Sequence, residues 1–177
     1  LIEAALISQK VNAPVKLIYS REDDMTSGIY RPAYSATYRA ALDKNKNLVA
    51  FHVKAGGIPE SPLEANRFPA GAVDNYLAES WTINSNITTG SFRAPRSNFM
   101  AAAEQSFMDE LAAAMGKDPI DFRLELLQRA KENPVGKEND YDANRYADVL
   151  KLVQEKSGWR KKQPNVHRGV SVYYCHN

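Results

Sequence analysis

Apolar and polar positions along the chain follow a strand-like pattern up to about residue 90 and a helical pattern after it. Two runs rich in β-branched and aromatic residues, 34–43 and 48–57, flank the short polar segment KNKN. Such a pair is typical of an antiparallel hairpin. The runs at 15–20 and 79–90 have the same strand character. Residues 58–79 contain three prolines and are expected to form a loop.

The pattern beyond residue 97 predicts three consecutive helices. In the first, apolar residues recur every four positions, Ser97 or Asn98 can serve as the N-cap, and Gly116 is a natural stop. The second begins at Asp118-Pro119, an N-cap followed by proline at the first helical position. The third covers about 142–157 and ends before a glycine. We expect Glu104, Asp109 and Glu110 on the solvent side of the first helix, and Tyr146, Val149, Leu150 and Val153 on the inner face of the third.

The order of these elements predicts an α+β fold, a mixed or antiparallel sheet with the three helices of about 97–157 packed on it. A further helix is expected at 2–12, with Ile2, Leu6 and Val11 on one face, and a further strand at 168–174. Residues 21–28 are a polar loop or a single helical turn. The chain starts without Met and stops inside the expected last strand, so we expect 1–177 to be one domain excised from a larger subunit.

Charge and composition exclude several classes of function. The net charge of +2, from 23 basic and 21 acidic residues, does not favour nucleic acid as a partner. No stretch has the apolar length of a membrane span. One cysteine forms no internal disulfide, and His52, His167 and His176 lack the spacing of metal ligands, so no metal site is expected. The acidic run SREDDM favours a solvated turn over acid–base chemistry or cation binding, because consecutive side chains diverge.

The segment GSFRAPRSN, residues 90–98, is the best candidate for binding. It places Arg93 and Arg96 in front of a helix, whose first turn offers unpaired N–H groups and a partial positive charge. Together these groups could hold an anion, most naturally a phosphate. The alternative is two solvated arginines that pair with nearby carboxylates. No Ser/His/Asp or Cys/His set is evident, so we assign no catalytic residue.

Three blocks of the sequence resemble, in the same order, the molybdenum-binding large subunit of the xanthine dehydrogenase/aldehyde oxidase family. They are PVKLIYSREDDMTSGIYRPA (14–33), GSFRAPRSNF (90–99) and EQSFMDELAAAMGKDPIDFRLELL (104–127). The branch they resemble most is the isoquinoline 1-oxidoreductase beta subunit. In the family a Phe-Arg or Trp-Arg loop lies against the molybdopterin cofactor and contacts it largely through backbone groups. The resemblance therefore implies that Phe92, Arg93 and Ala94 are cofactor-binding.

The resemblance also implies the chemistry of the whole enzyme and what this chain lacks. It implies hydroxylation of an aldehyde or N-heteroaromatic carbon with oxygen from water, and a [2Fe–2S] small subunit that takes the electrons. The catalytic glutamate would lie beyond residue 177 and the glycine-rich loop before Leu1, so we expect residues 1–177 alone to be inactive and to hold no cofactor. Xanthine dehydrogenases commonly have Gly-Phe after the arginine, and Ala94-Pro95 here disfavours purine hydroxylation. The rival hypothesis is a stand-alone anion-binding or protein-interaction module without redox activity.

Overall fold

The computed structural model describes residues 1–136, 139–161 and 163–175. Helices α1 (Ile2–Val11) and α2 (Arg21–Ser27) precede strands β1 (Ala33–Leu42), β2 (Leu48–Ile58) and β3 (Asn75–Thr82). Helices α3 (Ser97–Met115), α4 (Pro119–Glu132) and α5 (Ala143–Lys156) follow. The α+β class and the three consecutive helices are confirmed. No helix among the described residues is both long enough and apolar enough to span a bilayer.

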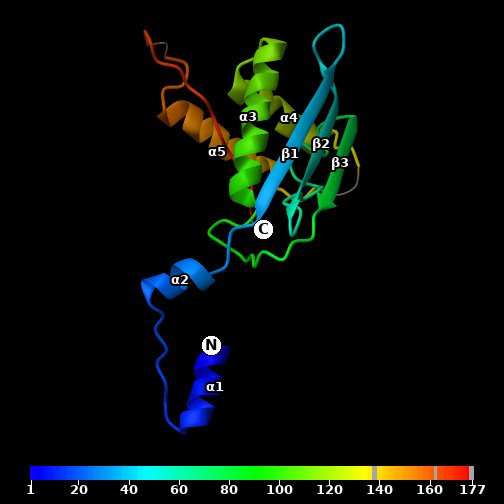
Figure 1. The fold of residues 1–177 in the computed structure, drawn as a ribbon. Coiled ribbons are helices and arrows are strands. Elements are labelled where there is room, and N and C mark those ends of the chain that lie inside the picture. The colour runs from blue at the N-terminus through cyan, green and yellow to red at the C-terminus, as the bar shows by residue number, and fades with distance from the viewer. Residues whose placement is uncertain (137–138, 162, 176–177) are drawn as a thin grey trace.

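The three strands form a mixed sheet in the order β1-β2-β3. Strands β1 and β2 make the expected antiparallel hairpin, in which Ala33 pairs with Ile58 and Ala40 with Phe51. Strand β3 runs parallel to β2, which it reaches through the proline-containing loop (Figure 1). It begins before the predicted strand 79–90 and ends at Thr82, so only the first part of that prediction is right.

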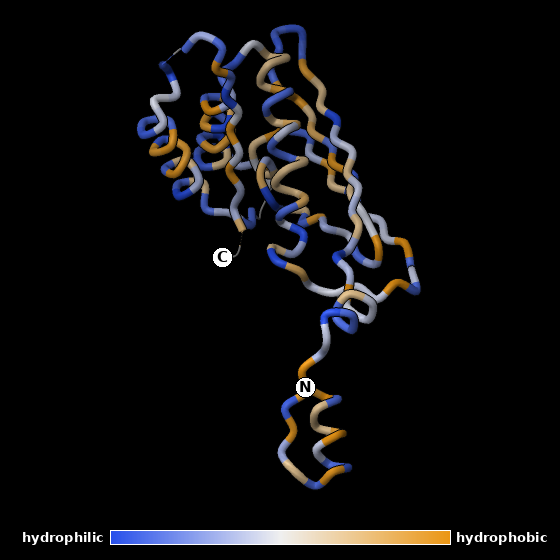
Figure 2. Tube along the Cα trace, turned by 60° about the vertical axis from the view of Figure 1, so that its left-hand side comes forward, coloured by the Kyte–Doolittle hydropathy of each residue, from blue (hydrophilic) through white to orange (hydrophobic). Residues whose placement is uncertain are grey.

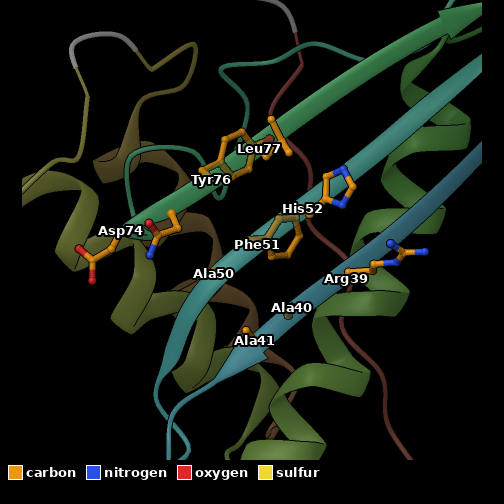
Figure 3. A pocket seen from close by; sticks show the side chains of 10 residues that line it. Arg39, Ala40, Ala41, Ala50, Phe51, His52, Asp74, Tyr76 and Leu77 are labelled. Atoms are coloured by element: carbon orange, nitrogen blue, oxygen red, sulfur yellow. The ribbon is translucent and has the colours of Figure 1, made fainter.

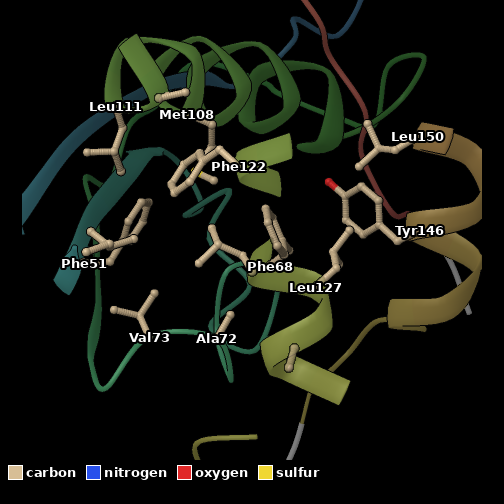
Figure 4. Close-up of a cluster of buried hydrophobic side chains, with 14 of the residues drawn as sticks. Phe51, Phe68, Ala72, Val73, Met108, Leu111, Phe122, Leu127, Tyr146 and Leu150 are labelled. Carbon is tan, nitrogen blue, oxygen red and sulfur yellow. The ribbon is translucent and has the colours of Figure 1, made fainter. Parts of the chain in front are cut away.

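The core lies between the sheet and the three helices (Figure 4). Phe51 of β2 stacks on Tyr76 of β3 at a centroid distance of 5.9 Å and meets Phe107 of α3 edge-on. Beyond it, Phe68 packs against Tyr146 of α5. These rings bury apolar area across both layers, which is the main stabilising contribution to such a core.

The caps explain why the helices begin and end where they do. The Asp118 carboxylate accepts hydrogen bonds from the N–H groups at the start of α4, and Asp142 does the same for α5. Gly116 ends α3 with φ of 73°, a left-handed conformation that suits glycine. The predicted cap of α3 is wrong, because Arg96 occupies the N-cap position and no side chain caps the helix.

Two faces of the predicted helices differ from expectation. Glu104 is buried, with 5 % of its surface exposed, whereas the sequence placed it on the solvent side of α3. Glu104 lies four positions from both Met100 and Met108, which are buried, so its place on the helix turns it inward. On α5, Tyr146 and Leu150 are buried as expected, but Val149 and Val153 are exposed. The buried stripe of α5 is therefore narrower than its apolar sequence pattern.

Residues 168–174 do not form the predicted strand. They run extended along the helices and are held by side chains instead of by a sheet. The fully buried guanidinium of Arg123 donates to the carbonyl of Val170 at 3.4 Å, and the Tyr146 hydroxyl donates to that of Val172 at 2.7 Å. Arg123 also donates to Asp109 and to both the side chain and the backbone of Gln105. A buried polar network replaces strand pairing here.

The first 20 residues lie apart from the core (Figures 1 and 2). Helix α1 forms as predicted, but Ile2, Leu6 and Val11 of its apolar face are exposed. Residues 15–20 form no strand, because their backbone pairs with no other described segment. The polar segment after them is helix α2, which begins with a capping box between Ser20 and Asp23.

Candidate functional site

The loop that joins β3 to α3 contains all the residues that the sequence assigned to cofactor binding. It passes beneath one end of the sheet, where β1 begins and β2 and β3 end (Figure 1). Its base is fixed by a parallel bridge between Tyr30 and Thr89. The Tyr30 N–H donates to the Thr88 carbonyl at 2.9 Å, and the Gly90 N–H donates to the Tyr30 carbonyl at 3.0 Å. We call residues 90–96 the arginine loop.

Arg31, which stands just before β1, contacts the tip of the arginine loop in two ways. Its guanidinium donates a hydrogen bond to the Arg93 carbonyl at 3.1 Å. The same group lies over the Phe92 ring, 4.6 Å from the centroid. This geometry combines a charged hydrogen bond with a cation–π contact. Phe92 and Arg93 are thus fixed in place by one side chain from a distant segment.

A second contact holds the other end of the arginine loop. Arg96 lies 2.5 Å from a carboxylate oxygen of Glu60, and the Tyr34 hydroxyl donates to the other oxygen at 2.8 Å. The hydrogen bond from Arg96 is the main reason that the pKa of Glu60 lies below its usual range. Burial, followed by the Glu60 hydrogen bond, raises the pKa of Tyr34 to about 12. The cavity among these side chains is only about 10 Å³, so they are closely packed.

The first turn of α3 is not the anion site that the sequence suggested. The Ser97 N–H donates to the Pro95 carbonyl, the Asn98 N–H to that of Ala94, and those of residues 99 and 100 to Arg96. Ala94 and Arg96 have positive φ values of 53° and 60°, and this backbone turns their carbonyls toward the helix. The donors of the helix are therefore already used.

The unpaired backbone N–H groups lie just before α3, in the arginine loop. Within the described chain, the backbone N–H groups of residues 91–94 donate to no other residue, and the exposed Arg93 side chain makes no hydrogen bond or ion pair. The arginine loop thus presents consecutive N–H donors beside one unpaired guanidinium. This donor set fits an anionic, phosphate-bearing ligand that is contacted through the backbone. Arg96, in contrast, pairs with the carboxylate of Glu60, as the alternative interpretation of the sequence expected.

An open groove lies over the sheet, away from the arginine loop (Figure 3). It has a volume of about 590 Å³ and is lined by the middle of β1 and β2 and the start of β3. His52 in this groove lies 2.7 Å from Glu79, and Asp74 pairs with Arg129, so these side chains already have partners. The rest of its lining is mainly apolar, apart from Arg39 and Asn75.

The remaining candidates do not form a site. The acids of the SREDDM run are exposed on α2, where Asp23 serves the capping box. Among the described residues, no three histidine, cysteine or acidic side chains are grouped so that they could hold a metal ion. His176 lies outside the described residues. Sequence reasoning missed Arg31, Tyr34 and Glu60. The block that carries the family resemblance contains Arg31, but no local signal linked Arg31 to Arg93, which is 62 positions away, or Glu60 to Arg96, which is 36 positions away.

The chain matches the family of the molybdopterin cofactor-binding domain over residues 2–127. It is 29 % identical to a membrane-bound aldehyde dehydrogenase of Gluconacetobacter polyoxogenes, whose name gives pyrroloquinoline quinone, over 91 % of this chain and 24 % of the relative. It is 24 % identical to isoquinoline 1-oxidoreductase subunit beta of Brevundimonas diminuta, over 97 % of this chain and 22 % of the relative. The chain therefore spans about a quarter of the length of these relatives.

Solved structures agree on the fold. Quinoline 2-oxidoreductase of Pseudomonas putida 86 matches with a TM-score of 0.62 and 18 % identity, over 90 % of this chain and 22 % of that one. The aldehyde oxidoreductase of Desulfovibrio gigas matches with a TM-score of 0.63 and 18 % identity. The match covers 88 % of this chain and 18 % of that one. The family match covers α1 to α4 and the whole arginine loop. The resemblance seen in the sequence is confirmed, and the chain belongs to the molybdopterin cofactor-binding domain family of the xanthine dehydrogenase and aldehyde oxidase enzymes.

Proposed function

We propose that the arginine loop is this chain's contact with the molybdenum cofactor, and that Phe92, Arg93 and Ala94 provide it. The observation that carries the proposal is the set of unpaired donors at residues 91–94, on a loop that is fixed at its base, tip and end. A prearranged loop loses little conformational entropy on binding, so its N–H groups contribute more of their interaction energy to affinity. The Arg93 guanidinium adds a charged donor for a phosphate or pterin oxygen.

We propose further that the chain works as one part of a larger subunit that hydroxylates an aldehyde or an N-heteroaromatic compound. The names of its relatives support both the reaction class and the subunit organisation. When bound, the cofactor supplies the two-electron redox chemistry. The residues of this chain bind and orient it, and the catalytic base and the [2Fe–2S] small subunit come from elsewhere.

The experiment is elemental and pterin analysis of the full protein, purified from a host that makes molybdenum cofactor. We expect close to one molybdenum per wild-type protein and about ten- to a hundredfold weaker retention in Arg93→Ala, since one charged hydrogen bond is lost. Arg39→Ala, an exposed arginine on β1, is the matched control and should retain the metal. Residues 1–177 alone should retain none. Wild-type protein without molybdenum, or with a quinone in its place, would overturn the proposal.

A further inference from the structure

We infer that Arg31 is a positioning residue that holds the arginine loop in the shape that meets the cofactor. The inference rests on the proposed function, because the loop must first be the cofactor contact. Arg31 itself is not assigned a contact with the cofactor. It acts through Phe92 and Arg93, the residues that it touches.

The backbone around Arg31 is fixed on both sides. Tyr30 forms the bridge with Thr89, Pro32 has a fixed φ and restricts the backbone of Arg31 before it, and β1 begins at Ala33. The guanidinium therefore projects from an anchored position and not from a mobile loop. Its side chain is half-buried, which strengthens a charged hydrogen bond relative to one in open water.

The two contacts of Arg31 act on Phe92 and Arg93, in the part of the loop that has the fewest other contacts through its backbone. The backbone N–H groups of residues 91–94 donate no hydrogen bond to a described residue. Of the carbonyls of residues 91–93, only that of Arg93 accepts a hydrogen bond from a described residue. Ala94 is held at positive φ, a conformation that a non-glycine residue leaves readily unless its surroundings fix it. Without Arg31 the tip would be free to relax out of this conformation.

Charge supports the same assignment. Arg96 is compensated by Glu60, whereas neither Arg31 nor Arg93 has a carboxylate partner among the described residues. These two guanidinium groups leave unpaired positive charge at the loop, which favours an anionic ligand. The planar guanidinium is also specific to the role, because it stacks on the ring while donating in its own plane, which an ammonium group cannot do equally well.

The test uses the full protein and the variants Arg31→Met and Arg31→Lys, with Arg39→Met as the matched control. In the cofactor-free form, the readout is tryptic cleavage at the Arg93–Ala94 bond, followed by mass spectrometry. Arg31 precedes Pro32, a bond that trypsin leaves intact, so replacing Arg31 does not itself change the tryptic map. In the loaded form, the readout is the rate at which molybdenum is lost.

We expect Arg31→Met to speed both cleavage and metal loss about tenfold or more, the effect of losing a charged hydrogen bond. Arg31→Lys should fall between it and wild type, because a cation over the ring is kept, and the unfolding midpoint should hardly move. If Arg31→Met behaves like Arg39→Met in both assays, the inference is wrong. Faster cleavage with unchanged metal loss overturns it as well, because the loop's order would then not matter to the cofactor.

Two further arms keep the result interpretable. If Arg31→Met does not fold, Phe92→Leu removes the cation–π contact alone, and it should speed cleavage more than Arg39→Met does. Failure of the proposed function shows differently, as wild-type protein that carries no molybdenum while its loop resists trypsin. Loss of protection in the Arg31 variants of a protein that does carry molybdenum therefore tests only the positioning role.

Discussion

The carboxylate of Glu60 lies between Arg96 and Tyr34 and joins the arginine loop to the end of β2. Arg96 approaches one carboxylate oxygen to 2.5 Å, and the Tyr34 hydroxyl donates to the other at 2.8 Å. The family resemblance implied cofactor binding by Phe92, Arg93 and Ala94 and assigned no role to Arg96. The structure instead gives Arg96 an anchoring contact and leaves the Arg93 side chain unpaired, so the two arginines serve different purposes.

Glu60→Gln should loosen the arginine loop with little effect on global stability. The pair is partly exposed, so we expect the free energy of unfolding to fall by no more than about 1 kcal/mol. Tryptic cleavage at Arg93–Ala94 should nevertheless become faster, because Arg96 loses its charged acceptor. Glu110→Gln, on the exposed face of α3, is the control. Equal cleavage rates in the two variants would show that the pair does not anchor the loop.

Arg123→Met should be the most destabilising single change discussed here. The guanidinium is completely buried, and it donates to Gln105, Asp109 and the carbonyl of Val170. Its removal leaves these acceptors unsatisfied and should lower the free energy of unfolding by about 3–5 kcal/mol. Arg129→Met, on the exposed side of the same helix, should cost less than about 1 kcal/mol. Urea denaturation measures both, and similar losses would contradict the central role of Arg123.

Tyr38→Phe should stabilise the protein or leave it unchanged. The Tyr38 hydroxyl is buried, and no described residue hydrogen-bonds it. Removing a buried unsatisfied hydroxyl eliminates a desolvation penalty of about 1–3 kcal/mol while the ring contacts with Phe51 and Phe107 remain. Tyr146→Phe is the contrast, because it orphans the Val172 carbonyl and should destabilise. Calorimetric midpoints that fall equally in both variants would count against this account.

Local signals predicted most of the elements of the fold. The hairpin follows from two strand-like runs and a polar turn, and the start of α4 follows from Asp118 and Pro119. Such features depend on neighbours in sequence. The strand predicted at 15–20 does not form, for the opposite reason: a segment with strand propensity becomes a strand only where another strand pairs with it. The strand predicted at 168–174 does not form either, since side chains from distant segments, and not a neighbouring strand, hydrogen-bond its backbone carbonyls.

The site was predictable only in part. The resemblance pointed to the arginine loop, but its use as the cofactor contact remains a proposal, and the supporting contacts were not predictable. Whether Arg96 meets Glu60 depends on how the loop after β2 turns, and no periodicity encodes this. Glu104 was misplaced because its charge favoured the solvent side, although it lies four positions from both Met100 and Met108 on the buried face of α3.

Glu104 should make stability depend on pH in a direction opposite to that of an ordinary surface acid. Burial raises the pKa of its carboxyl to about 8, against 4.5 in the unfolded chain, although Gln105 and Arg123 partly oppose the shift. Tyr38, Tyr76, Tyr141, Tyr146 and Tyr173 surround it as neutral phenols, since burial raises the pKa of each.

Between pH 4.5 and about 8 the folded chain keeps this proton while the unfolded chain releases it, so the folded state binds more protons. The contribution of Glu104 to stability is therefore complete below pH 4.5, declines as the pH rises, and is gone above about 8, with a slope of at most about 1.4 kcal/mol per pH unit. In Glu104→Gln this dependence should vanish, because the amide does not titrate. Urea denaturation of both proteins from pH 5.5 to 8.5 measures it as the difference between two curves. That difference should shift in favour of the variant as the pH rises, and parallel curves would mean that Glu104 does not hold its proton in the folded state.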